Sequence, residues 1–273
     1  MTLVSTDWLN KNLNKVKIID ASWHLIKNRN AIEEYNKEHI ENAIFFDLDK
    51  NSNQRKDLPH GHFLPSISDH EKIISEMGIL NTDRIIIYCY SDLISSCRAW
   101  FQFLYFGHDP KLVSVLNGGL KKWKIEKKTV VNDLPVINKS EYRAKENKEM
   151  VKSKVQIDEN INLKRFKVID ARSIGRFEGK IAEPRSNVRS GSIEGSSCLP
   201  FNQLINKDDN TFKSIDDLND IFGKIVDIND NNIVFSCGSG VTASVLALAY
   251  SLINNKYIPT IYDGSWSEYG LIK

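Results

Sequence analysis

The feature that most constrains the fold of this 273-residue chain is an internal repeat. Three segments of the first half recur in the second half, with similar residues in the same order. The offsets, taken from Asp20 to Asp170, Cys89 to Cys237 and Gly118 to Gly264, are 150, 148 and 146 positions. Three matches at nearly one offset indicate that the chain contains two copies of a single unit. The matched segments are 16–22 with 167–173, 84–89 with 232–237, and 113–123 with 260–269.

Each copy alternates short β-branched runs with stretches that favour a helix. The runs VKIID and KVID are typical of buried parallel strands, and we expect helices over 96–106 and 241–253. This alternation predicts an α/β protein of two tandem domains, each a parallel sheet with helices on both faces. We expect an N-terminal domain over 1–131, a linker over 132–163 and a C-terminal domain over 164–273. The linker is rich in Lys, Glu and Asn, and we expect a helix near 140–148 within it.

Composition excludes several classes of protein. A formal net charge of +2 is too small to predict nucleic-acid or membrane binding through charge alone. No apolar run reaches transmembrane length, and residues 1–13 lack the apolar region of a secretory signal, so we expect a cytoplasmic protein. The four cysteines have neither zinc nor disulfide spacing, which indicates free thiols, a reducing compartment and no metal.

The sequence CGSGVTA at 237–243 lies between a predicted strand, 233–236, and the helix that begins near Val241. Two glycines let the backbone curl so that N–H groups point inward, and the helix adds the partial positive charge of its N-terminus. Such a loop stabilises a Cys237 thiolate or the outer sulfur of a persulfide, which predicts a nucleophilic cysteine. The residues expected to form this cradle are Gly238, Ser239, Gly240, Val241 and Thr242.

Two other readings of the loop can be compared with this one. A cysteine phosphatase needs an arginine six residues after its cysteine, and Ala243 stands there, so that class is excluded. A non-catalytic interaction module would be expected to lose its cysteine or its glycines, and this chain keeps both. In the first copy, Cys89 is followed by YSDLI, which has no glycine and carries a negative charge. We therefore expect Cys89 to be non-catalytic, and Cys97 and Cys198 to be ordinary, partly buried thiols.

The loop, together with YDGSW at 262–266, resembles the active-site domain of the rhodanese superfamily, and both repeats match its tandem arrangement. CGSGVT is most similar to the loop of 3-mercaptopyruvate sulfurtransferases, whereas thiosulfate sulfurtransferases typically carry CRKGVT. The resemblance implies an enzyme without a cofactor that moves sulfur from a small anionic donor through a Cys237 persulfide, releasing pyruvate. The implied acceptors are cyanide, a small thiol or thioredoxin. Thiosulfate is the alternative donor, although a neutral loop fits a donor whose carboxylate is remote from its sulfur.

The resemblance also implies roles for two arginines. Arg176, in Gly-Arg-Phe, and Arg185, in Glu-Pro-Arg, match the two substrate-binding arginines of the family. A planar guanidinium suits a carboxylate because it donates two parallel hydrogen bonds. The segment 192–196 reads SIEGS where the family usually has HIPGA, a departure at three positions.

Carbon–sulfur cleavage leaves an enolate that must be protonated. The resemblance implies that Ser239 works here with a histidine and an aspartate from the N-terminal domain, which match His62 and Asp49 and place the site in the interdomain cleft. His60 and Asp47 are competing matches for these two positions.

Overall fold

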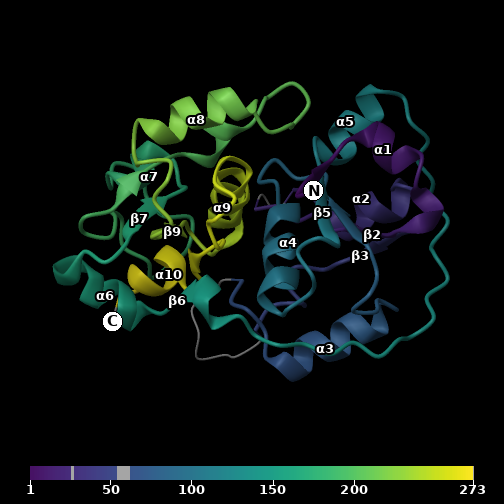
Figure 1. The fold of residues 1–273 in the computed structure, drawn as a ribbon, viewed down its shortest axis with the longest axis horizontal. Helices are drawn as coiled ribbons and strands as arrows, with labels where there is room; N and C mark the ends of the chain where they lie inside the picture. The colour runs from purple at the N-terminus through teal and green to yellow at the C-terminus, as the bar shows by residue number, and fades with distance from the viewer. Residues whose placement is uncertain (26–27, 54–61, 273) are drawn as a thin grey trace. The chain divides into compact units, whose positions relative to one another are not determined.

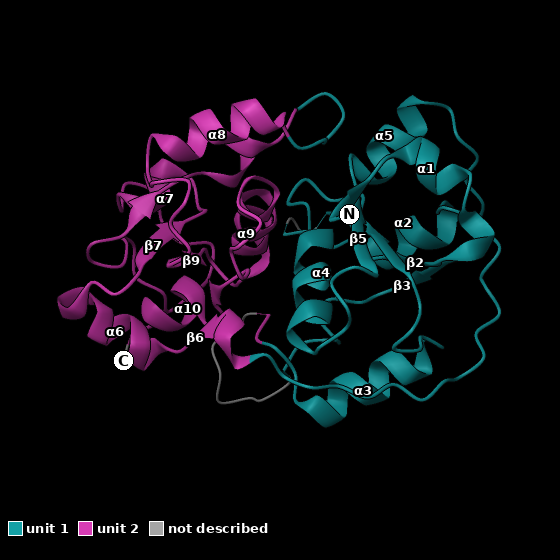
Figure 2. Ribbon diagram, viewed as in Figure 1, with its two compact units in different colours: residues 1–53, 64–147, 207–212 teal, residues 54–63, 148–206, 213–273 magenta. Residues whose placement is uncertain are grey.

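The computed structural model describes residues 1–25, 28–53 and 62–272 (Figure 1). The chain divides into two compact units, shown in Figure 2. Unit 1 comprises residues 1–53, 64–147 and 207–212, and unit 2 comprises residues 54–63, 148–206 and 213–273. Each unit is made of three separate segments of the chain, so this division cannot be compared directly with domain boundaries at residues 131 and 164. Those boundaries stay a prediction.

Unit 1 contains five strands, which are β1 (Leu3–Val4), β2 (Lys17–Asp20), β3 (Ala43–Phe45), β4 (Ile85–Tyr88) and β5 (Val113–Leu116). Its helices are α1 (Thr6–Asn10), the 3-10 turn η1 (Leu13–Lys15), α2 (Ala31–Lys37), α3 (Ile67–Glu76), α4 (Ser96–Tyr105) and α5 (Gly119–Ile125). The strands of unit 2 are β6 (Val151–Lys152), β7 (Lys167–Asp170), β8 (Ser197–Cys198), β9 (Ile233–Ser236) and β10 (Ile261–Tyr262). Its helices are η2 (Lys148–Met150), α6 (Lys154–Leu163), α7 (Ile174–Phe177), η3 (Phe201–Leu204), α8 (Ile215–Gly223), α9 (Val241–Ile253) and α10 (Ser265–Tyr269).

Both sheets are parallel and have the same topology, with orders β1-β5-β4-β2-β3 and β6-β10-β9-β7-β8. After β2 the chain forms β3 on one side of β2, and it then crosses back to form β4 on the other side of β2. In unit 2, β7, β8 and β9 follow the same path. Because crossovers are right-handed, connections that run in opposite directions put their helices on opposite faces of the sheet. The expected α/β fold of two tandem domains is confirmed.

This topology fixes where a ligand site is expected. The direction of the crossovers reverses between β2 and β4 in unit 1 and between β7 and β9 in unit 2. In open parallel sheets, ligands bind beyond the carboxyl ends of the strands at such a reversal. Cys89 directly follows β4 and Cys237 directly follows β9, so both repeat cysteines lie at this position.

The helices that follow the two cysteine loops are buried almost all round. All ten residues of α4 are buried, as are nine residues of α9, which is apolar along most of its length. A helix that is apolar on every side is stable only inside a core, where each large apolar side chain contributes about 1.5–3 kcal/mol. The start of α9, and the loop that leads into it, are therefore held in a fixed position.

One predicted helix is wrong. Residues 140–147 are not helical, and only the short η2 turn lies nearby. The backbone N–H groups of Ser140 and Lys145 instead donate to the carbonyls of Ser75 (2.9 Å) and Phe106 (3.0 Å) in unit 1. These distant partners satisfy the groups that a helix would have paired locally. The end of the expected linker does form a helix, α6, which opens with a capping box of Ser153 and Gln156.

None of the helices in the described part of the chain has the length and apolar character needed to cross a bilayer.

Candidate active site

Cys237 directly follows β9 and begins the turn that leads into α9. It is 2% exposed, and its Sγ accepts a hydrogen bond of 3.1 Å from the backbone N–H of Gly240. Val241 and Thr242 begin α9, whose N-terminal partial positive charge is next to the sulfur. The amide and the helix end both direct positive charge at Sγ, which is the arrangement that stabilises an anion.

The two glycines of this loop have different structural roles. Gly240 has a φ of 82°, in the left-handed region that a Cβ disfavours, so it makes the curl of the backbone. Gly238 needs no positive φ, but a Cβ there would lie 3.2 Å from Arg176 Nη2 and 3.2 Å from Arg185 Nη1. Gly238 therefore lets two guanidinium groups approach the loop closely, a role that sequence reasoning did not assign to it.

The motif YDGSW at 262–266 holds the cysteine loop in place through hydrogen bonds. Ser265 Oγ accepts from the backbone N–H of Cys237 (3.2 Å) and donates to the carbonyl of Tyr262 (2.8 Å). The backbone N–H groups of Trp266 and Ser267 donate to the carbonyls of Cys237 (2.9 Å) and Gly238 (3.0 Å). Ser265 is held at a φ of 48°, uncommon for a residue with a side chain. In the sequence this motif stood out only by its resemblance to the family. Its hydrogen bonds to the cysteine loop were not predicted.

Arg176 and Arg185, the two predicted substrate-binding residues, both lie against the loop at Gly238. Arg176 belongs to α7 and is 20% exposed in its side chain, and Arg185 follows in the next loop. Burial lowers the pKa of Arg185, while the charge of Cys237 acts in the opposite direction. A guanidinium stays protonated even so. No carboxylate forms an ion pair with Arg185 among residues 1–25, 28–53 and 62–272.

A buried network of charges supports Arg176. Glu183 binds Arg176 through Oε1 to Nε (3.1 Å) and Oε2 to Nη2 (2.5 Å), and its Oε1 also accepts from Arg172 Nη1 (2.7 Å). Arg172 in turn binds Asp170 Oδ2 through Nη2 (2.6 Å) and the carbonyl of Gly191 (2.8 Å). Burial raises the pKa of Glu183, but the hydrogen bonds and charges of the two arginines outweigh it and hold the pKa below its usual range.

His62 lies beside Ser239, but it belongs to unit 2, whereas the resemblance implied a histidine from the N-terminal domain. That the two residues act together in the reaction stays a prediction. His62 Nδ1 lies 3.2 Å from Ser239 Oγ, both side chains are buried, and both residues belong to unit 2. Ser239 is two residues from Cys237, so a proton could pass from this pair toward a molecule bound at the sulfur. His60, the competing match, lies outside the described residues.

The structure places Asp49 in unit 1, where its carboxylate accepts a hydrogen bond of 3.0 Å from Trp23 Nε1. Its competitor Asp47 caps a turn instead, since it accepts from Lys50 N (3.1 Å) and pairs with Lys50 Nζ (3.2 Å). The role of Asp49 in the reaction stays a prediction.

The corresponding site of unit 1 is closed. Cys89 is 5% exposed, its S–H donates to Ser96 Oγ (3.3 Å), and burial raises the pKa of its thiol. The space beside it, lined in part by Asn210 and Phe212, holds about 10 Å³, roughly one water molecule. That Cys89 is not catalytic stays a prediction. Of the other two cysteines, Cys97 is fully buried and Cys198 half-buried.

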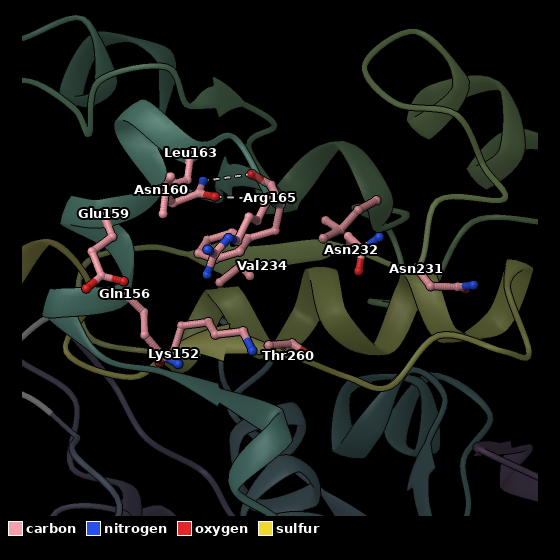
Figure 3. Close-up of a pocket in the computed structure, with 12 residues that line it drawn as sticks. Lys152, Gln156, Glu159, Asn160, Leu163, Arg165, Asn231, Asn232, Val234 and Thr260 are labelled. Carbon is pink, nitrogen blue, oxygen red and sulfur yellow. Dashed lines mark hydrogen bonds between the residues drawn. The ribbon is translucent and has the colours of Figure 1, made fainter.

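A larger hollow of about 340 Å³ in unit 2 is separate from the cysteine site (Figure 3). It lies between α6 and the segment that enters β9, with Lys152, Arg165 and Asn232 on its walls. Asn232 precedes the amino end of β9 and Cys237 follows its carboxyl end, so the two features lie at opposite ends of the strand. Among the described residues, no cluster of three potential ligands could hold a metal ion.

Comparison with known proteins defines the class of this fold and site. Residues 5–126 and 153–271 both match the family described as rhodanese-like domain. The chain belongs to this family and carries two copies of its domain.

Individual relatives match along almost the whole chain. The protein is 35% identical to the mitochondrial thiosulfate/3-mercaptopyruvate sulfurtransferase 1 of Arabidopsis thaliana, over 98% of this chain and 75% of that protein. It is 34% identical to the thiosulfate sulfurtransferase of Rattus norvegicus, over 98% of this chain and 91% of that one. The crystal structure of SseA, a 3-mercaptopyruvate sulfotransferase from Escherichia coli, superposes with a TM-score of 0.86 at 31% identity, covering 98% and 100% of the two chains. Overall identity does not separate the two donors, so the choice between them depends on the site.

Proposed function

We propose that this protein is a sulfurtransferase that moves sulfur from 3-mercaptopyruvate through a Cys237 persulfide to a thiophilic acceptor. The observation that carries the proposal is the position of Cys237 Sγ at the N-terminus of α9, in a loop whose next residue, Gly238, lies against two guanidinium groups. A nucleophilic sulfur and a carboxylate-binding pair of arginines are what a sulfur-bearing keto acid requires.

In the first half-reaction, the donor carboxylate binds Arg176 and Arg185, and the Cys237 thiolate attacks the donor sulfur. A sulfur–sulfur bond forms and the carbon–sulfur bond breaks, so its electron pair stays on carbon as the enolate of pyruvate. Protonation of that carbon gives pyruvate. Ser239 and His62, whose polar atoms are 3.2 Å apart, supply the proton. Asp49 is included in this proton-transfer group by family resemblance alone.

In the second half-reaction, an acceptor attacks the outer sulfur of the persulfide. The sulfur–sulfur bond breaks, the acceptor leaves with the sulfur, and the Cys237 thiolate is restored. Cyanide or a small thiol suffices chemically, and thioredoxin is the protein acceptor that family resemblance suggests. Two half-reactions on one cysteine predict ping-pong kinetics. A cytoplasmic location belongs to the same proposal, and the Arabidopsis relative is named as mitochondrial.

Thiosulfate is the second candidate donor, because the names of close relatives include it. The geometry at Gly238 favours 3-mercaptopyruvate. A loop with basic side chains at positions 238 and 239, as in CRKGVT, would bring cations to a dianion directly at the sulfur. Here the loop is neutral, and the space beside Gly238 is occupied by the guanidinium groups of Arg176 and Arg185.

The test is a donor assay on wild type, Cys237→Ser and Cys198→Ser. Cys198 is a matched control, since it is a free, half-buried thiol of the same unit. We expect wild type and Cys198→Ser to release pyruvate from 3-mercaptopyruvate and to gain the mass of one sulfur atom on the Cys237 peptide. Cys237→Ser should do neither. Pyruvate release by Cys237→Ser would refute the mechanism, and a higher kcat/KM of wild type with thiosulfate would refute the donor.

A further inference from the structure

Glu183 holds Arg176 in one orientation. The carboxylate binds the side of the guanidinium formed by Nε and Nη2, at 3.1 and 2.5 Å. Such a bidentate pair fixes the plane of the guanidinium as well as its distance. Nη2 is also the atom of Arg176 that lies against Gly238, so Glu183 holds the guanidinium while one of its nitrogens is at the loop. Among the residues that the structure describes, none binds Nη1.

Glu183 is itself held from behind by Arg172. The Glu183 side chain is 2% exposed and that of Arg172 is fully buried, and they meet at 2.7 Å. Arg172 is fixed by Asp170 at the end of β7, by the carbonyl of Gly191, and by the ring of Trp266, 4.6 Å from its Cζ. The orientation of Arg176 is thus connected, through two buried ion pairs, to the end of a central strand.

The repeat provides an internal comparison. Asp170 matches Asp20, and Arg172 matches Ser22, so the copy with Cys89 has a hydroxyl where the copy with Cys237 has a buried arginine. Burying the charge of an arginine lowers the free energy of unfolding unless ion pairs and hydrogen bonds compensate for its lost hydration. Folding of the repeated unit does not require it, because unit 1 forms the same five-stranded sheet without it.

The network also sets the charge that the site presents. Asp170 and Glu183 balance Arg172 and Arg176, which leaves Arg185 as the cation near the loop without a carboxylate partner among the described residues. Arg185 then supplies one positive charge that faces the Cys237 thiolate and that no carboxylate of the described residues neutralises, which suits a donor with a single carboxylate. It is less suited to a dianion such as thiosulfate.

We propose that Glu183 is a positioning residue that orients Arg176 for the donor carboxylate and restricts the site to monoanionic donors. This inference rests on the proposed function, because it assigns Arg176 to the donor. Glu183 does not touch the reacting atoms; it acts through Arg176 and through the net charge beside it.

The test compares Glu183→Gln with Glu178→Gln, which makes the same carboxylate-to-amide change in the same segment. Glu178 is a suitable control because its side chain pairs with the exposed Lys180. Kinetics are measured with 3-mercaptopyruvate and with thiosulfate, using cyanide as acceptor. In Glu183→Gln we expect KM for 3-mercaptopyruvate to rise about tenfold or more with little change in kcat. We expect the ratio of kcat/KM for 3-mercaptopyruvate to that for thiosulfate to fall about tenfold, and Glu178→Gln to resemble wild type.

Glu183→Asp separates orientation from charge and serves if Glu183→Gln does not fold. It keeps the negative charge but is one methylene too short to reach both arginines, so KM should rise while the donor ratio stays near that of wild type. An equal loss with both donors in Glu183→Gln indicates a purely structural residue and overturns the inference, as does a wild-type KM in Glu183→Asp. Wild-type protein that releases no pyruvate refutes the proposed function itself, before any variant is compared.

Discussion

Asp20, at the carboxyl end of β2, lies at the centre of a prediction about stability and pH. Its carboxylate is buried and accepts hydrogen bonds from the backbone N–H (2.9 Å) and the hydroxyl of Ser22. Burial raises its pKa from 3.8 to about 6, which the bonds from Ser22 only partly oppose. In unit 2 the matching Asp170 has the Arg172 guanidinium as its partner.

The difference between 3.8 in the unfolded chain and about 6 in the folded one corresponds to about 3 kcal/mol. Because the folded state binds the proton more tightly, this stabilisation is fully present below about pH 4 and is lost as pH rises through 6. Asp20→Asn stays neutral at every pH. We therefore expect the free energy of unfolding of the variant to increase by about 3 kcal/mol relative to that of wild type between pH 4 and pH 8, so the variant gains relative stability.

Urea denaturation at several pH values, followed by tryptophan fluorescence, measures this difference. Four of the five tryptophans belong to unit 1, so the signal reports mainly on the unit that contains Asp20. His70, whose pKa burial lowers to about 3, changes stability with the opposite sign, but it is present in both proteins and cancels. Asp92→Asn, which changes an exposed carboxylate of the same unit, is the control. A difference between Asp20→Asn and wild type that stays constant across this pH range would refute the reasoning.

Two further predictions concern the cysteine loop. Gly240→Ala places a Cβ on a residue with a φ of 82°, so it should lower the free energy of unfolding by about 1–2 kcal/mol in urea denaturation. Gly238→Ala should leave stability closer to that of wild type and raise KM for the donor, since its Cβ meets both arginines. Equal loss of stability in the two variants would contradict this division of roles. His62→Ala should lower kcat with 3-mercaptopyruvate about 100-fold or more. It should lower kcat with thiosulfate less, because sulfite leaves without protonation at carbon. Steady-state kinetics with both donors test this, and an equal loss of kcat with both would exclude His62 as the proton source.

The fold could be predicted from the sequence because its signals are local. Parallel strands covered on both faces appear as short unbroken apolar runs, and each run here ends at the residue that the structure gives as the end of its strand, as at Asp20 and Asp170. The glycine at position 240 marks the curl before α9 for the same reason, since φ is a property of one residue. Local signals also identified Cys237 as the exceptional cysteine.

The remaining features depend on partners that are distant in the sequence. Residues 140–147 have the composition of a helix, but their backbone groups bind carbonyls near residues 75 and 106. The segment 207–212, from the second half of the chain, packs in unit 1, where Phe212 N donates to Asn117 Oδ1 (2.9 Å). The need for a glycine at position 238 also depends on distant residues, because Arg176 and Arg185 lie against it.

The two copies show how one fold can surround its two cysteine loops with different charges. In both, a buried aspartate ends the strand that pairs with the one leading into the cysteine loop, and its charge needs a partner. In unit 1 the Asp20 carboxyl group accepts hydrogen bonds from Ser22 and Tyr88, and burial leaves it with a pKa of about 6. Unit 2 has Arg172, and the charge of Arg172 then requires Glu183, which in turn binds Arg176. A residue that compensates a buried carboxylate in the core is therefore the first of a series of ion pairs that ends on an arginine at the sulfur loop, so the core of this copy contributes to the specificity of its site.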